Sequence, residues 1–249
     1  MKNLMIVLLS LCAVTTAQAQ FAGQAPITSA AGSTNTVANS AIQQFLGPIS
    51  DAEMKRKAID ISNAQGSPYT SFKFAPTTLY YNDEKIGDIF YRYNALNEEV
   101  EIKRSQLEEE GYRGLSNDKK ISLIIDGKKM AFNTFITSKK RTTNGYLTTL
   151  VDGEEYDLFK RITVKYTEGQ DAQNSFVAAV PAKFSQFTEY YYQKKGVNRI
   201  DEVIAKNSKL LKVLDANEKV KTKEFLKENS LNVKNETDLI KTFEFLNGK

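Results

Sequence analysis

Hydrophobic and polar residues alternate along much of the chain between residues 77 and 193. Three stretches share one form, in which an apolar run is followed by a two-residue polar turn and then by an alternating run: 77–93, 121–136 and 146–166. Alternation with a period of two residues is typical of β-strands with one buried face. The pattern predicts an antiparallel sheet that proceeds from hairpin to hairpin, with one more strand at 187–193.

The polar turns within these stretches are Asn82-Asp83, Asp126-Gly127 and Asp152-Gly153. Type I′ turns need a positive φ at both central residues, which Asn, Asp and Gly adopt more readily than other residues. All three pairs therefore predict two-residue hairpin turns.

Residues 89–104 predict a further hairpin that reverses at residues 95–97. Alternation places Arg92 and Asn94 on one face of its first strand. On the returning strand, three charged residues alternate onto the face opposite the apolar side chains, where they are expected to meet water: Glu99, Glu101 and Lys103.

From residue 199 the pattern becomes helical, with a period that predicts helices at 208–214, 218–229 and 236–246. Asn235 is the expected N-cap of the last helix. Four apolar residues of that helix form one stripe, which is expected to pack against the sheet: Leu239, Ile240, Phe243 and Leu246. The fold class is thus α+β, an antiparallel β-meander, curved or barrel-like, followed by a small C-terminal helical segment.

The N-terminus has the form of a secretory signal peptide, with Lys2, an apolar run and the exit Ala17-Gln18-Ala19. Cleavage is expected before Gln20, and the apolar run is too short to span a bilayer. The organisation predicted is a signal peptide at 1–19, a flexible leader at 20–65 that includes a short helix at 52–61, a β-rich domain at 66–198 and C-terminal helices packed on the sheet at 199–249.

The composition excludes several kinds of chemistry. The chain has no histidine, and its one cysteine, Cys12, lies in the signal peptide. Thiol nucleophiles, Ser-His-Asp triads and metal sites built from His or Cys are therefore excluded in the mature chain, and no cofactor or metal is expected. The formal net charge of +4 is small, which argues against a nucleic-acid partner.

Two readings of the acidic residues stay open. Glu99 and Glu101, two positions apart on a strand, would hold their carboxyl groups roughly 6 to 7 Å apart, near the lower limit of the spacing in inverting glycosidases. The same residues are also what the solvated face of an amphipathic strand requires.

The candidate binding residues are aromatic or basic. Tyr190, Tyr191 and Tyr192 form the most aromatic run, and an exposed tyrosine is a frequent anchor for a protein partner. Arg92 is added because it lies among aromatic residues on the predicted hairpin. The basic run at residues 139–141 falls in a predicted loop, where it would contact phosphate or an anionic lipid, or simply be solvated.

Four segments carry a resemblance: GSPYTSFKF at 66–74, FYRYNALNEEVEIK at 90–103, EYYYQKKG at 189–196, and the tail at 207–247. Together they resemble a family of exported, uncharacterised proteins of Bacteroidota-type Gram-negative bacteria. The resemblance implies export, a β-rich body and a helical tail, and it transfers no catalytic residue. A chain that ends in a helix favours the periplasm or the periplasmic side of the outer membrane over surface secretion.

The function expected from the sequence is that of an exported envelope protein that binds or scaffolds another envelope component without catalysis. Its expected partner is an envelope protein, with peripheral association at the outer membrane and no transmembrane helix. The alternatives are a carboxylate-based hydrolase that acts on carbohydrate or peptidoglycan, and a small-ligand binder with an aromatic cavity.

Overall fold

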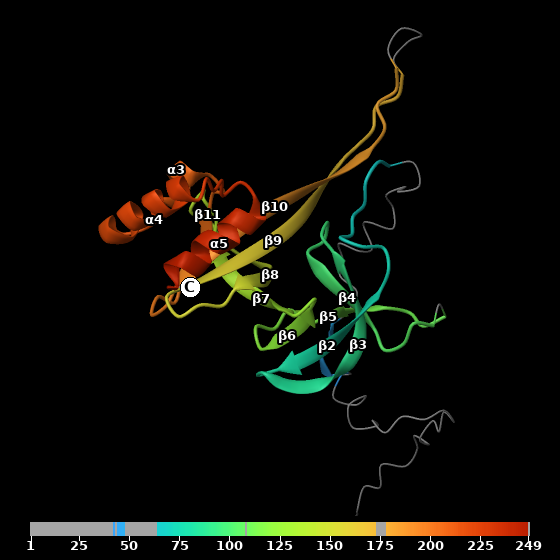
Figure 1. Ribbon diagram of the computed structural model, residues 1–249. Helices are drawn as coiled ribbons and strands as arrows, with labels where there is room; N and C mark the ends of the chain where they lie inside the picture. The colour runs from blue at the N-terminus through green and yellow to red at the C-terminus, as the bar shows by residue number, and fades with distance from the viewer. Residues whose placement is uncertain (1–41, 43, 48–63, 108, 173–177, 249) are drawn as a thin grey trace, which may run out of the picture. The chain divides into compact units, whose positions relative to one another are not determined.

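The structure is a computed structural model that describes residues 42, 44–47, 64–107, 109–172 and 178–248. In this part of the chain, an 11-stranded sheet is followed by helices α3, α4 and α5 (Figure 1). Its strands pair antiparallel except β11 with β7, which pair in parallel. The predicted α+β class, with a curved antiparallel sheet and a small C-terminal helical segment, is confirmed.

The first half of the sheet has the strand order β1-β5-β4-β3-β2-β6. Its strands are β1 (Leu46–Gly47), β2 (Ala75–Tyr81), β3 (Glu84–Asn94), β4 (Glu99–Lys103), β5 (Arg113–Leu115) and β6 (Ile121–Ile125). Apolar side chains from these strands form a buried cluster that includes Leu79, Ile89 and Val100. Burial of this cluster stabilises the first half of the sheet.

The second half of the sheet closes into a ring. Its strands are β7 (Lys128–Ile136), β8 (Thr142–Val151), β9 (Tyr156–Thr167), β10 (Lys183–Lys194) and β11 (Asp201–Val203). Each of the first four pairs with the next, and β11 returns to β7 through the parallel pair Asp201 and Ile136. Phe135, Leu147 and Tyr191 from these strands meet in a separate buried cluster.

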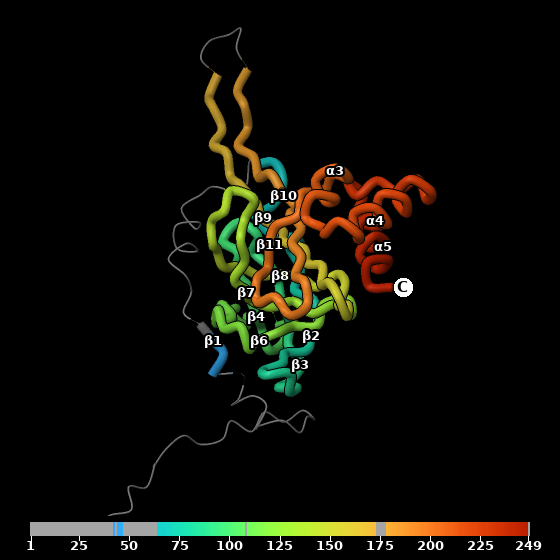
Figure 2. The backbone as a smooth tube through the Cα atoms, turned by 90° about the vertical axis from the view of Figure 1, so that its left-hand side faces the viewer, coloured from blue at the N-terminus to red at the C-terminus, as the bar shows by residue number. Residues whose placement is uncertain are grey.

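Strands β9 and β10 form a long antiparallel ribbon, paired from Tyr156 with Lys194 to Thr167 with Lys183. Val164 and Phe184, on one face of the ribbon, pack into the cluster of the first half of the sheet. Figures 1 and 2 both show the ribbon continuing away from the other strands beyond this contact. The ribbon therefore links the two halves of the sheet.

Two of the three predicted hairpin turns are confirmed. Asn82 and Asp83 have φ angles of 49° and 65°, and Asp126 and Gly127 have φ angles of 50° and 74°. A positive φ at both central residues is the property of a type I′ turn.

The prediction for the third turn is wrong. Strands β8 and β9 are joined by four residues, 152–155, and none of these has a positive φ. The reason is a tertiary contact with Asn247, at the end of α5. Its side chain accepts hydrogen bonds from the backbone N–H groups of Glu155 and Tyr156, at 2.8 and 2.9 Å. A Cβ atom at Gly153 would overlap this side chain, so the glycine makes room for it.

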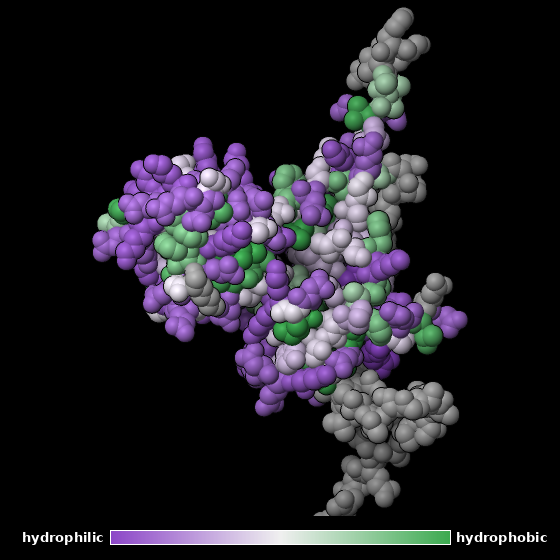
Figure 3. All heavy atoms as spheres, viewed as in Figure 1, coloured by the Kyte–Doolittle hydropathy of each residue, from purple (hydrophilic) through white to green (hydrophobic). Residues whose placement is uncertain are grey.

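The helices are α3 (Asn207–Leu210), α4 (Ala216–Glu228) and α5 (Glu236–Leu246), so the predicted bounds of the last helix are confirmed. Asn235 caps α5 as predicted, since its side chain accepts from Thr237 N at 2.8 Å. The apolar stripe packs within the chain: Leu239 and Phe243 are 0% and 1% exposed and pack with residues of β8 and β9, and Ile240 and Leu246 are partly buried against the same cluster. The face of the helical segment seen in Figure 3 is mostly hydrophilic.

The predicted signal peptide and the predicted helix at 52–61 lie outside the described residues. Within the predicted leader, residues 42–47 are described in part, and Ile42 is buried while Phe45 and Leu46 pack against the same cluster. The apolar side chains at these positions attach this short segment to the sheet. No helix in the described ranges is long and apolar enough to cross a membrane.

Candidate functional site

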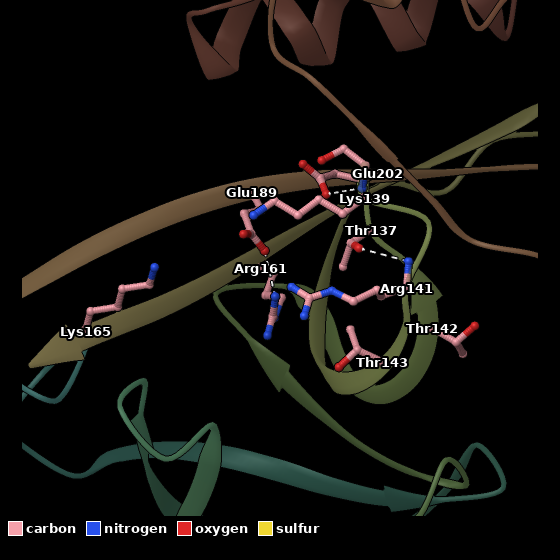
Figure 4. Close-up of a pocket in the computed structure, with 10 residues that line it drawn as sticks. Thr137, Lys139, Arg141, Thr142, Thr143, Arg161, Lys165, Glu189 and Glu202 are labelled. Atoms are coloured by element: carbon pink, nitrogen blue, oxygen red, sulfur yellow. Dashed lines mark hydrogen bonds and ion pairs between the residues drawn. The ribbon is translucent and has the colours of Figure 1, made fainter.

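A polar pocket of about 420 Å³ lies where the turn between β7 and β8 meets the ribbon of β9 and β10 (Figure 4). Four cations line it against two carboxylates. The turn contributes two of the cations, β9 the other two, and β10 and β11 one carboxylate each: Lys139, Arg141, Arg161, Lys165, Glu189 and Glu202. Side chains distant in the sequence thus converge at one surface.

The turn between β7 and β8 is held by hydrogen bonds of Thr137. Its N–H donates to Arg141 O at 2.9 Å, and its carbonyl accepts from Lys140 N at 2.8 Å. Lys140 has a φ of 60°, in the left-handed region. From β11, Glu202 accepts from Ser138 N at 2.6 Å. The basic run, predicted as a loop, is therefore a structured turn tied to a neighbouring strand.

Arg161 lies at the base of the pocket, with its side chain only 12% exposed. Its guanidinium is paired with Glu98 Oε1 at 2.6 Å and with Glu189 Oε2 at 2.7 Å. Tyr191 donates its hydroxyl to the same Glu189 oxygen at 2.9 Å. Burial opposes the charge of Arg161, but Glu98 and Glu189 raise its pKa and keep it charged. Arg161 therefore holds Glu98 and Glu189 together at the base of the pocket, and these two carboxylates balance its charge.

The three remaining cations of the pocket differ from Arg161 in their contacts. Lys139, Arg141 and Lys165 make no ion pair among the described residues. Lys165 Nζ lies 5.4 Å from the ring centroid of Phe187. Thr137 of the turn and Thr142 and Thr143 of β8 line the same pocket. Cations and hydroxyl groups around a concave surface are suited to bind an anionic group.

Arg92, a predicted binding residue, lies in a different cluster and has its own partners. Its Nε donates to Glu101 Oε2 at 2.9 Å, its Nη2 is bound to the same oxygen, and its Nη1 donates to Phe72 O at 3.3 Å. Three rings lie around its Cζ atom, at centroid distances of 3.9, 4.5 and 5.1 Å: Tyr69, Phe74 and Tyr112. The structure thus places Arg92 in a packed ion pair, separate from the pocket.

The prediction that Glu101 meets water is wrong, because Glu101 is 0% exposed. Besides Arg92 it is bound by Asn94, whose Nδ2 donates to Oε1 at 3.0 Å. The rings around Arg92 shield this face of the hairpin, which alternation alone presents as solvated. Glu99 is partly exposed, so Glu99 and Glu101 do not share access to one substrate. The spacing that suggested a pair of catalytic carboxylates therefore has a structural cause.

Tyr190, Tyr191 and Tyr192, the other predicted binding residues, are packed to different degrees. Tyr191 is 0% exposed, and its ring centroid lies 4.5 Å from that of Phe135. Tyr190 and Tyr192 are half-buried against the cluster that contains the C-terminal helices, and Tyr190 donates its hydroxyl to Glu236 at 2.9 Å. A partner cannot reach the ring of Tyr191 in this fold, and binding through the other two stays a prediction.

The sequence analysis identified the basic run of the pocket but not the residues that the ribbon of β9 and β10 contributes. Arg161 and Lys165 alternate with apolar residues along β9, and this alternation was a readable signal that both lie on the face opposite Val164. Glu189 stands opposite Arg161 in the register of the ribbon, and no local pattern indicates that pairing. In the described part of the chain, no group of three or more Asp or Glu residues is arranged to hold a metal ion.

Comparison with protein-family models, with curated proteins and with solved structures gives no match for this chain.

Proposed function

We propose that the protein binds an anionic component of the cell envelope through the pocket at the turn between β7 and β8, and that it acts by binding rather than by catalysis. The observation that carries this proposal is the convergence of Lys139, Arg141 and Lys165, none of which has a carboxylate partner among the described residues. The proposal keeps the expectation of an exported protein that binds an envelope component, and it assigns that binding to the pocket.

The arrangement favours a ligand over simple solvation of lysines. The turn that presents Lys139 and Arg141 is fixed by backbone hydrogen bonds, and Arg161 with its two carboxylates forms a rigid base. Like charges held near one another repel, and a bound anion relieves that repulsion. With Glu98 included, four cations meet three carboxylates at this pocket, so the pocket keeps a net positive charge.

The other expected functions have less support. A partner docked on the apolar stripe of α5 would have to displace it from the core, because Leu239 and Phe243 are buried. The hydrolase alternative relied on Glu99 and Glu101, and Glu101 is sealed in an ion pair with Arg92. Binding at the pocket requires neither change.

The test is calorimetric titration of the protein with inorganic pyrophosphate. The variant Lys139→Gln/Arg141→Gln/Lys165→Gln removes the unpaired cations and retains the base of the pocket. We expect its affinity to fall about tenfold or more, and the affinity of the unaltered protein to fall as salt rises.

The matched control removes the same number of charges from exposed positions of α4, in the variant Lys219→Gln/Lys221→Gln/Lys223→Gln. Its affinity for pyrophosphate is expected to stay within about twofold of the unaltered protein. No detectable binding by the unaltered protein, or an equal loss in both variants, would refute a specific anion site.

A further inference from the structure

The ribbon of β9 and β10 has two chemically different faces. One face carries Val164 and Phe184 into the core of the first half of the sheet. The register of the ribbon places Lys165 opposite Ser185, and Thr163 opposite Phe187, on the other face. Side chains two positions apart share a face of a strand, so this second face also carries Arg161 and leads directly into the pocket.

Phe187 is the unexpected residue on the stretch of this face from Arg161 to Lys165, where its neighbours in the register are polar. It is 45% exposed, although a phenylalanine in a strand usually turns towards a core. Lys165 Nζ lies 5.4 Å from its ring centroid, and Lys165 also lines the pocket. An exposed aromatic ring is therefore continuous with the unpaired cations.

The pocket also contains a hydrogen-bond acceptor, Glu202, to which a simple anion has no donor to offer. Glu202 uses Oε2 to accept from Ser138 N, and no hydrogen bond of the described residues uses its other carboxylate oxygen. A ligand that fits the whole surface has an acid group for the cations, hydroxyl donors for this carboxylate, and an apolar ring face to lie on Phe187.

We infer that the ligand of this pocket is an acidic saccharide. Its carboxylate or phosphate pairs with Lys139, Arg141 and Lys165, its hydroxyls donate to Glu202, and the C–H face of a sugar ring packs on Phe187. This inference rests on the proposed anion site and adds the chemical class of the ligand. A nucleotide would also offer a ring and phosphate but presents fewer hydroxyl donors.

The experiment compares the full chain with Phe187→Ala and Phe187→Tyr by titration with an oligogalacturonate, a neutral hexose oligomer of equal length, glucose 6-phosphate, ATP and pyrophosphate. We expect the acidic saccharide with the better matched acid group to bind most tightly. Phe187→Ala should weaken saccharide binding about tenfold and pyrophosphate binding less than about twofold. Phe187→Tyr, which keeps an aromatic ring, should bind the saccharide as the unaltered protein does. Val180→Ala, which removes another exposed apolar side chain of the ribbon region, should have no effect.

The outcomes separate the two proposals. If pyrophosphate binds and neither acidic saccharide binds more tightly than pyrophosphate, the saccharide inference is overturned and the anion site stands. Tighter binding of ATP than of both acidic saccharides, or an equal loss of pyrophosphate and saccharide affinity in Phe187→Ala, also overturns it. If no anion binds, both proposals fail. A difference between oligogalacturonate and glucose 6-phosphate identifies which acid group the pocket prefers.

Discussion

Arg92 and Arg161 are similar by simple measures and different in their surroundings. Each lies in a strand, each is bound by carboxylates, and their side chains are 13% and 12% exposed. Three aromatic rings surround Arg92, whereas Arg161 lies over the ring of Phe135 and lines the polar pocket. The first cluster is closed by aromatic side chains, and the second opens on cations that have no partner.

The role of a mostly buried arginine therefore depends on the groups that lie beside its ion pair. Both guanidinium groups are compensated, so neither is the direct binding group for an anion. In the Arg92 cluster, Lys103 lies over the ring of Phe74 and donates to Leu107 O, so the cation beside that pair is held against the protein itself. At the pocket, Arg161 orders two carboxylates, and the neighbouring Lys139 and Arg141 supply the uncompensated charge.

The largest expected effect is on the Arg92 cluster. Glu101→Ala leaves Arg92 buried without its carboxylate, and the loss of one partner from a buried ion pair costs about 3–5 kcal/mol. The free energy of unfolding by urea measures this loss. Glu98→Ala is the matched change at the pocket, and we expect a smaller loss because Arg161 keeps Glu189. Equal losses would mean that the two clusters do not differ as described.

A substitution in the core beneath α5 provides a reference for the loss in free energy of unfolding expected for Glu101→Ala. Phe243→Ala removes a ring that is 1% exposed in the core beneath α5, and is expected to lower the free energy of unfolding by about 3 kcal/mol or more. Its pyrophosphate affinity at a temperature where it is folded should match that of the unaltered protein. Unchanged stability would show that the stripe of α5 is not held in the core in solution.

Replacing each arginine with methionine distinguishes a residue that only stabilises the fold from one that also supports anion binding. Arg161→Met leaves Glu98 and Glu189 uncompensated beside the pocket, so we expect pyrophosphate affinity to fall about tenfold along with stability. Arg92→Met should lower stability and leave affinity within about twofold, because its cluster does not line the pocket. Calorimetry on both variants measures the difference, and a loss of affinity in Arg92→Met would contradict it.

The smallest expected effect is a pH dependence from Glu98. Burial raises the pKa of Glu98 above its ordinary value of 4.5, although Arg161 opposes the shift. An acid whose pKa is raised by folding contributes stability that is complete below the unfolded pKa and is lost as pH rises through the folded pKa. Glu98→Gln should therefore flatten the stability profile just above pH 4.5, measured by urea unfolding. An unchanged profile would show that Glu98 does not titrate in this way.

Local signals made much of the fold predictable. The turns at Asn82-Asp83 and Asp126-Gly127 depend on φ preferences of the residues themselves, and α5 depends on a cap and an apolar stripe within one segment. The third turn was not predictable in this way, because Asn247, far away in the sequence, occupies the space beside Gly153. Strand β11, with only three residues, carries too short a pattern to be recognised.

The candidate site was predictable only in part, for the same physical reason. The basic run at 139–141 is a local feature and was identified, but the pocket exists because the ribbon brings Arg161, Lys165 and Glu189 beside it. The burial of Glu101 likewise depends on rings from other segments. Alternation assigns a face to each side chain, and only tertiary contacts decide whether that face meets water.

The parallel pairing of β11 with β7 has a consequence for the order of folding. The pair is joined where Ile136 N donates to Ile200 O at 2.8 Å, and β8, β9 and β10 lie between these strands in the chain. The hairpins of the first half form from neighbouring segments, whereas this closure must wait for three further strands and bears the entropy of a long loop. We therefore expect ring closure to be the late, slow event. A chain still emerging before residue 200 holds its hairpins but leaves the end of β7 near Ile136 open to another strand, since β6 pairs only with residues 128–131 of β7.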